Sequence, residues 1–289
     1  MTVYLNGTYL PKSEAKVSVE DRGFIFGDGV YEVWRVINGR LFEMNRHHAR
    51  LTRGLGEVRI TPPAESHIDT LQEIAERLLA ENDLTEGEGT LYLEITRGAA
   101  PRVHHFPPPD TRPTVYAMVN RFVPPEDTRA KGVTTVTVPD VRWMRCDIKT
   151  IQLLPNVMAK QAASERGATE AILVRDGVVT EGSHTNVMGV LGGEIRTHPA
   201  NHLILPGITR AVVLELAREL GIPVREQPIA ASDVPKAEEL FLVGTTMDVM
   251  PVVRVDEVTI GAGKPGPIAQ RLYAALRAHL DATAAAAIA

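Results

Sequence analysis

The 289-residue sequence predicts an α+β protein with two domains. Short apolar runs typical of strands mix with longer runs at helical spacing, without the regular strand–helix–strand alternation of a parallel α/β fold. A charged stretch with two adjacent prolines, 121–131, predicts a linker between a small N-terminal domain (1–120) and a larger C-terminal domain (132–289). The sequence contains no internal repeat.

Two Asn-Gly dipeptides in the N-terminal domain predict tight turns within two hairpins. The first hairpin joins Val3–Leu5 to Tyr9–Leu10. The second joins Val30–Ile37 to Leu41–Phe42. Both pairs of runs are rich in apolar and aromatic residues, which strands favour.

Two helices and two strands are predicted to complete this domain. Asn45 and Ser66 are expected to cap the helices, because their side chains can accept hydrogen bonds from free backbone N–H groups. The strands are expected at Leu91–Thr96 and Thr114–Val119. A proline- and histidine-rich loop, 101–113, lies between them.

The C-terminal domain has similar signals in a different order. A helix over 208–220 is well marked, with Ile208, Val212, Leu216 and Leu220 as its apolar stripe and Gly221 as its stop. We expect the tail 282–289 to fray. The remaining predicted elements are a strand at Val133–Val138, a helix from a cap at Asn156 to near Gly167, a hairpin at Ala171–Thr180, a strand at Phe241–Val243 and a helix from Pro267.

Composition limits the possible class of protein. Hydrophobic content of 44% and charged content of 23% are ordinary for a globular protein. A net charge of -5 without long runs of one sign argues against a nucleic-acid partner. The single Cys146 excludes an internal disulfide, and neither a signal pattern nor an apolar run of about 20 residues occurs. We therefore expect a cytoplasmic protein without a membrane span.

Lys149 is the most informative candidate residue. The chain has 31 basic residues, of which only seven are lysines, and this one precedes Ile151, Leu153 and Leu154. A desolvated amine is shifted toward its neutral, nucleophilic form, which Schiff-base chemistry requires and arginine cannot supply. Taken alone, the pattern also fits a lysine that extends from a half-buried strand.

Two short loops could bind an anion such as phosphate. Leu205-Pro206-Gly207 leads into a helix that begins at Ile208 and Thr209, whose free N–H groups and positive dipole end attract anions. Gly244-Thr245-Thr246 follows a predicted strand and offers further donors. Each loop alone also fits an ordinary helix start or turn.

Arginines supply the other anion ligands. Arg50 lies in a short helix after His47 and His48, where it could clamp a phosphate or face solvent. Arg102 and His104 lie two apart in the proline-rich loop, so both can contact one carboxylate if the loop is extended. Isolated histidines and one cysteine argue against a metal site.

Together these segments resemble the fold-type IV pyridoxal-phosphate enzymes, among them the D-amino acid aminotransferases. The resemblance runs from about residue 3 to about residue 280. It rests on Asp21–Glu32, Arg50, Arg102–His104, Asp147–Lys149, Glu181–Ser183, Leu205–Arg210 and Gly244–Thr246.

The resemblance implies a small α/β domain, a larger domain with a β-barrel-like core, and pyridoxal 5'-phosphate (PLP) at the domain interface. Lys149 would hold the cofactor as a Schiff base and move the substrate proton, and Glu181 would pair with the pyridine nitrogen. Leu205 would pack against the cofactor ring. The expected phosphate ligands are Arg50, Ile208, Thr209 and Thr245.

The resemblance also implies how substrates bind. Arg102, His104 and Tyr31 would hold the carboxylate of amino acids and 2-oxo acids, and Val33 would line the side-chain pocket. In this family the loop residues complete the neighbouring subunit's site, which implies a homodimer. The expected reaction is transamination between D-amino acids such as D-alanine and 2-oxo acids such as 2-oxoglutarate.

The sequence departs from the family's usual residues at three positions, and three alternative functions remain open. Gly244 replaces a frequent serine, His184 follows Ser183 where a small hydroxyl residue is common, and Trp34 is bulkier than usual. The rival activities are branched-chain L-amino acid transamination and the aminodeoxychorismate lyase reaction, neither of which shares the Arg102–His104 trap. A cofactor-carrying protein without turnover is the third rival.

Overall fold

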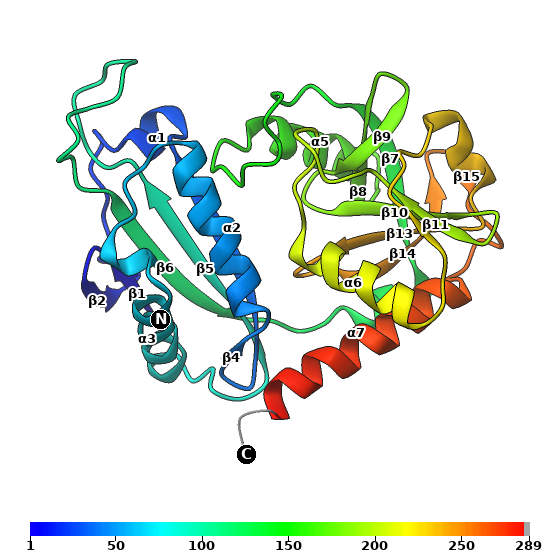
Figure 1. The fold of residues 1–289 in the computed structure, drawn as a ribbon, viewed down its shortest axis with the longest axis horizontal. Helices are drawn as coiled ribbons and strands as arrows, with labels where there is room; N and C mark the ends of the chain where they lie inside the picture. The colour runs from blue at the N-terminus through cyan, green and yellow to red at the C-terminus, as the bar shows by residue number, and fades with distance from the viewer. Residues whose placement is uncertain (286–289) are drawn as a thin grey trace. The chain divides into compact units, whose positions relative to one another are not determined.

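The computed structural model describes residues 1–285, which form two compact units (Figure 1). The first unit contains Met1–Val123, Ile148–Leu153 and the end of the chain from Leu280. The second contains Pro124–Asp147 and Leu154–His279. This division differs from the predicted one, because the segment that carries Lys149 belongs with the first unit although the sequence places it within 132–289.

The first unit is built on a six-stranded antiparallel sheet in the order β2-β1-β6-β5-β3-β4. Both predicted hairpins are confirmed, since β1 pairs with β2 and β3 with β4. The strands are β1 (Thr2–Leu5), β2 (Thr8–Pro11), β3 (Gly29–Ile37), β4 (Arg40–Leu41), β5 (Glu88–Thr96) and β6 (Thr114–Arg121).

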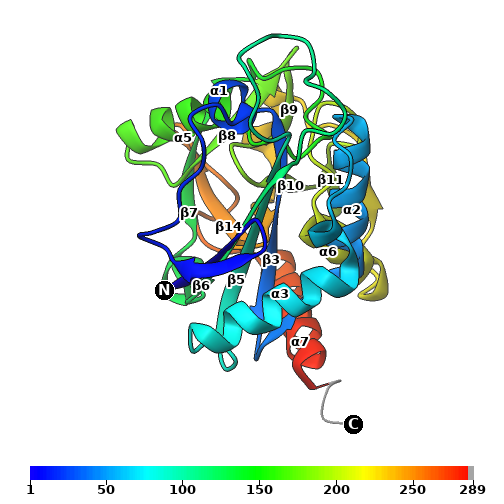
Figure 2. The ribbon, with the colours of Figure 1, turned by 90° about the vertical axis from the view of Figure 1, so that its left-hand side faces the viewer.

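Helices α2 (Met44–Glu57) and α3 (Ile68–Glu81) pack along this sheet (Figure 2). Trp34 of β3 lies in their shared core with Leu55 and Leu78, and all three are fully buried. Because side chains alternate along a strand, Tyr31 and Val33 project to the opposite face. The unit also contains the short helix α1 (Arg22–Phe26) and the 3-10 turn η1 (Ala64–Ser66).

The predicted helix caps are wrong. Helix α2 begins after Glu43 and encloses Asn45, while α3 begins after His67, and neither cap residue makes a side-chain hydrogen bond to the helix. Ser66 instead donates from Oγ to the carbonyl of Pro63 at 2.7 Å. A Ser or Asn near a helix start has other local partners, which the sequence pattern does not exclude.

The second unit is built on a nine-stranded mixed sheet in the order β12-β11-β10-β13-β14-β7-β8-β9, with β15 beside β14. Strand β9, at one end, also contacts β10, so the sheet curls back on itself. Its strands are β7 (Val133–Pro139), β8 (Glu170–Arg175), β9 (Val178–Gly182), β10 (Asn186–Leu191), β11 (Glu194–Thr197), β12 (Val224–Arg225), β13 (Glu239–Gly244), β14 (Asp248–Val255) and β15 (Val258–Thr259).

The remaining helices correct the predictions in three places. Helix α4 (Glu126–Lys131) occupies part of the stretch 121–131, and the division between the units falls inside that stretch, after Val123. Helix α5 (Leu154–Glu165) encloses Asn156, which donates from Nδ2 to the carbonyl of Ser183 instead of capping the helix. The η2 turn spans Ala231–Lys236.

Helices α6 (Ile208–Glu219) and α7 (Pro267–Ala285) lie where the sequence predicts them. The buried face of α6 contains Val213 and Ala217, whereas Leu220 of the predicted stripe is exposed. Residues 282–285 continue α7, and the rest of the predicted frayed tail, 286–289, lies outside the described residues.

The α+β class is therefore confirmed, although the sequence interpretation missed strands β10–β12, β14 and β15. Across residues 1–285, none of the helices combines the length and apolar character needed to cross a membrane.

Candidate functional site

The predicted site residues fall into two groups, one in each unit. The first unit contains Lys149, Tyr31, Val33, Arg50, Arg102 and His104. The second contains Glu181, Leu205, Ile208, Thr209 and Thr245.

Lys149 lies beside the beginning of β3. Its carbonyl accepts a hydrogen bond from the Tyr31 N–H at 3.0 Å, and Thr150 forms an isolated bridge with Val30. The Lys149 Nζ lies 4.2 Å from the centre of the Tyr31 ring. The contact of the Lys149 amine in its own unit is therefore with the face of an aromatic ring.

Tyr31 and Val33 are half-buried on the sheet face away from α2 and α3. Trp34, whose size the sequence left as a concern, points the other way and is fully buried in the helix-facing core. The bulk of Trp34 therefore does not reach the face that carries Tyr31 and Val33.

Arg50 takes part in a buried charged cluster that the sequence did not predict. Its Nε and Nη2 donate to the two carboxylate oxygens of Glu32 at 2.6 and 2.9 Å. His47 Nδ1 lies 2.9 Å from Glu32 Oε2. Burial alone would raise the pKa of Glu32, but the charge and hydrogen bonds of Arg50 and His47 outweigh it and hold that pKa well below its usual range.

Burial has the opposite effect on the histidine of this cluster. It lowers the pKa of His47 despite the attraction of Glu32, so the neutral ring is favoured near neutral pH. Arg50 is then the cation that balances the Glu32 carboxylate. The sequence contains a pattern that could have indicated this cluster. His47 and Arg50 are three residues apart and therefore share one face of α2, where both can reach a carboxylate such as Glu32.

Glu181 is the centre of the second unit's group. Its Oε2 accepts hydrogen bonds from the Leu205 N–H and from Asn186 Nδ2, both at 3.0 Å, while Oε1 accepts one from Arg142. The structure thus brings together two predicted residues, Glu181 and Leu205. Arg142 and Asn186 were missed, because neither has a sequence pattern that points to Glu181.

Arg142 contacts two carboxylates, Asp140 and Glu181, and their pKa values shift in opposite directions. Asp140 receives hydrogen bonds from Arg142, Arg175 and Thr180, and although burial raises its pKa, the Arg142 contacts outweigh that effect and lower it to about 2. Burial dominates at Glu181 and raises its pKa to about 7 despite the charge of Arg142. A positively charged partner would therefore favour the ionised form of Glu181.

Asn186 connects Glu181 to both donor loops. Its Nδ2 also donates to the Leu205 carbonyl at 3.0 Å. A Cβ at Gly207 would lie 2.2 Å from Asn186 Oδ1, so only glycine permits this approach at the start of α6. On β10, Asn186 is the register partner of Val243, the residue before Gly244.

The donor loops have the properties that a phosphate site needs. Gly207 caps α6 without a side-chain hydrogen bond to the first turn, which contains Ile208 and the buried Thr209. The loop Gly244–Thr246 leaves β13 beside Asn186. A Cβ at Gly244 would make only ordinary contacts of 3.7 Å or more, so the missing serine reflects no lack of space.

His184 belongs to a separate ion pair. Its Nδ1 lies 2.7 Å from Glu170 Oε2, and its side chain is 45% exposed. The departure at this position therefore places a half-exposed imidazole beside a buried glutamate.

Arg102, Val103 and His104 are exposed in the loop between β5 and β6. The Val103 carbonyl accepts a hydrogen bond from Arg22 Nη1 at 2.7 Å. The His104 ring lies 5.7 Å from that of Phe26. Arg102 and His104 are thus exposed on the surface of the first unit, and their segment contacts α1.

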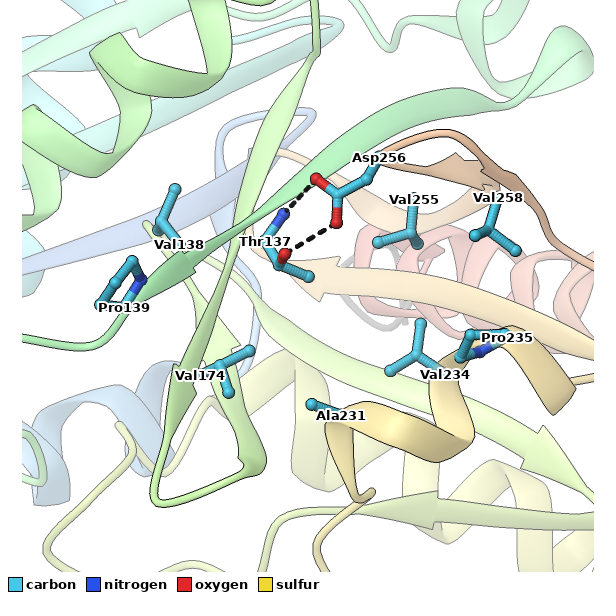
Figure 3. A pocket seen from close by; sticks show the side chains of 10 residues that line it. All are labelled: Thr137, Val138, Pro139, Val174, Ala231, Val234, Pro235, Val255, Asp256 and Val258. Carbon is cyan, nitrogen blue, oxygen red and sulfur yellow. Dashed lines mark hydrogen bonds between the residues drawn. The ribbon is translucent and has the colours of Figure 1, made fainter.

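A pocket of about 380 Å³ in the second unit contains none of these residues (Figure 3). It lies among β7, β8, β14, β15 and η2, and valine side chains form much of its lining. Its polar groups are paired with each other, since Asp256 accepts hydrogen bonds from the Thr137 N–H and hydroxyl at 3.0 and 2.7 Å. The pocket therefore offers no reactive group.

Comparisons with known proteins identify the family of the chain. Residues 29–255 match the family described as Amino-transferase class IV. The chain is 43% identical to the D-alanine aminotransferase of Bacillus licheniformis over 282 residues, with 96% of each chain covered. It is 39% identical to that of Staphylococcus aureus (strain N315) over 279 residues, covering 96% of this chain and 98% of the relative.

A solved structure is also similar. The branched-chain aminotransferase of the archaeon Thermoproteus uzoniensis, solved with norvaline, has a TM-score of 0.86 and 27% identity. The likeness covers 97% of this chain and 95% of that one.

Proposed function

The chain belongs to the class IV aminotransferase family, and we propose that it transfers the amino group between D-amino acids such as D-alanine and 2-oxo acids such as 2-oxoglutarate, with PLP as cofactor. The observation that carries this proposal is the Glu181 cluster. Glu181, a buried carboxylate with a pKa of about 7, accepts a hydrogen bond from Leu205, just before a helix whose first turn has no side-chain cap; such a pair of features suits the two ends of a pyridoxal phosphate.

The second unit's residues fit the cofactor. Glu181 would pair with the ring nitrogen, and a protonated nitrogen would favour the ionised carboxylate, whose orientation Asn186 and Arg142 fix. The N–H groups of Ile208 and Thr209 and the Thr245 side chain would hold the phosphate, and Leu205 would pack on the ring. Arg50, in the first unit, is the further phosphate ligand that the family resemblance implies.

Lys149 performs the proton transfer. When bound, the cofactor supplies an electron sink for the pair left at the substrate α-carbon. Lys149 Nζ would hold the cofactor at rest, and the amine would then take the α-proton of the substrate and release it again during the first half-reaction. The position of the Lys149 amine 4.2 Å from the centre of the Tyr31 ring, beside a residue proposed to bind substrate, supports this role.

Substrate orientation decides which enantiomer reacts. Arg102, His104 and Tyr31 hold the carboxylate, with arginine supplying two parallel donors. Fixing the carboxylate determines which hydrogen on the α-carbon faces Lys149, and Val33 lines the space for the side chain. The sequence relatives support D-specificity over branched-chain L-transamination, since they are 39% and 43% identical whereas the branched-chain structure is 27% identical.

Assembly as a homodimer in the cytoplasm forms part of the proposal. Six large apolar side chains of the second unit are exposed, from the segment 141–144 and from α5: Val141, Trp143, Met144, Leu154, Val157 and Met158. Apolar side chains concentrated in this way are typical of contacts between subunits. The single, buried Cys146 suits a reducing compartment.

The overall reaction tests the proposal. Purified protein with PLP, D-alanine and 2-oxoglutarate is expected to release pyruvate and form glutamate of the D configuration, which chiral chromatography identifies. A parallel reaction with L-leucine serves as the matched control. If L-leucine alone produced glutamate, transamination would stand and D-specificity would be wrong.

A further inference from the structure

Phe26, the last residue of α1, contacts both members of the exposed Arg102–His104 pair. The guanidinium carbon of Arg102 lies 5.3 Å from the centre of the Phe26 ring, and the His104 ring lies 5.7 Å away at 45°. Arg22 lies over the same ring at 4.7 Å. Attraction between cations and an aromatic face restricts the rotamers of all these side chains.

Arg22 also fixes the backbone of the pair. Its Nη1 donates to the carbonyl of Val103, the residue between Arg102 and His104. Its Nε donates to Asp28 Oδ2 at 2.8 Å, and Arg22 is 3% exposed. A buried guanidinium with a carboxylate partner is a rigid anchor, because separating the two would leave a buried charge without its partner.

Asp28 connects this anchor, through Arg97, to a second position in the loop, Phe106. Its two oxygens accept hydrogen bonds from Arg97 at 2.8 and 2.9 Å, and Arg97 stacks on Phe106 at 3.7 Å. Burial raises the pKa of Asp28, but Arg97 and Arg22 outweigh it and lower that pKa. The loop is therefore tied at residues 103 and 106 while Arg102 and His104 remain exposed.

We propose that Phe26 and the Arg22–Asp28 pair are positioning residues that hold Arg102 and His104 ready for the substrate carboxylate. The inference rests on the proposed function, in which that pair binds the carboxylate. Exposed long side chains lose rotamer freedom when they bind a ligand, so holding them in place beforehand increases affinity. The ring contacts of Phe26 are with Arg22, Arg102 and His104.

Steady-state kinetics of the PLP-loaded enzyme test the proposal. Phe26→Leu is expected to raise KM for D-alanine and for 2-oxoglutarate about fivefold to tenfold, with kcat changed less than about twofold. Phe26→Tyr keeps the ring and is expected to restore KM. Tyr9→Leu is the matched control, because it removes a ring that Arg77 covers at 3.8 Å elsewhere in the same unit.

The outcomes separate this inference from the proposed function. An unchanged KM in Phe26→Leu, with wild-type D-alanine turnover intact, would overturn the positioning role and leave the function standing. Equal effects of Phe26→Leu and Tyr9→Leu would also overturn it, since a general loss of stability would then explain the change. Wild-type enzyme without D-alanine turnover would overturn both.

Discussion

Glu181→Gln isolates the electrostatics of the second unit. The Glu181 side chain is 7% exposed, and burial raises its pKa from 4.5 to about 7. Ionising it in the cofactor-free protein therefore costs about 3 kcal/mol more than ionising it in the unfolded chain, at about 1.4 kcal/mol per tenfold change in the equilibrium. Glutamine cannot ionise, so the variant lacks this cost, and its side-chain oxygen can still accept a hydrogen bond from Asn186 or Leu205.

The sign of the pH dependence follows from the raised pKa. The folded state holds the Glu181 proton more tightly, so this contribution is fully present below pH 4.5 and is lost as the pH rises through about 7. The pKa of about 7 already includes the attraction of Arg142, so the pH dependence follows from the titration of Glu181 alone. The difference in stability between variant and wild type should therefore move in the variant's favour by about 2.5 kcal/mol between pH 5 and pH 8.

Urea unfolding of the cofactor-free protein, at one protein concentration and at pH 5, 6, 7 and 8, measures this difference. Glu165→Gln, on the surface of α5, is the control and should show no such trend. A stability difference independent of pH would refute the reasoning, because Glu181 would then be ionised throughout and Arg142 would outweigh burial.

Three further changes have defined expected outcomes. Lys149→Ala should lower kcat for D-alanine by about a thousandfold, and unchanged turnover would contradict its role in proton transfer. Arg50→Ala should lower the unfolding free energy by about 3–5 kcal/mol, since it leaves Glu32 buried with only His47; urea unfolding with an effect below about 1 kcal/mol would argue against this. Gly98→Ala should destabilise by more than about 1 kcal/mol in the same assay, because φ is +91° and the Cβ would lie 2.0 Å from the Arg112 carbonyl oxygen. A neutral result would mean that the loop shifts freely.

The sequence predicted local features better than distant partners. Asn-Gly turns defined both hairpins of the first unit, because turn geometry depends on adjacent residues. The caps at Asn45, Ser66 and Asn156 failed because a short polar side chain has several local partners.

The candidate site shows the same limit. The resemblance pointed to Glu181 and Leu205, which the fold joins directly. Asn186 and Arg142 were not predicted, since their roles arise only when β9, β10 and the segment before α6 meet. The Glu32 contact of Arg50 was also missed, because the pairing of a strand with a helix sets it.

The structure adds the position of Lys149 to what the sequence predicted. Its side chain is partly buried, and its segment pairs with the start of β3 beside Tyr31. This backbone pairing fixes the position of the Lys149 backbone next to Tyr31, one of the residues proposed to hold the substrate carboxylate. In the proposed mechanism, the residues that bind the substrate carboxylate then decide which α-hydrogen faces this amine.

The most direct test of the central claim is the first half-reaction with opposite enantiomers. PLP-loaded protein is mixed with D-alanine or L-alanine without a 2-oxo acid, and the visible absorbance of the cofactor is followed. The account predicts rapid conversion to the pyridoxamine form with D-alanine and none on the same timescale with L-alanine. Conversion by L-alanine at an equal or higher rate would contradict it.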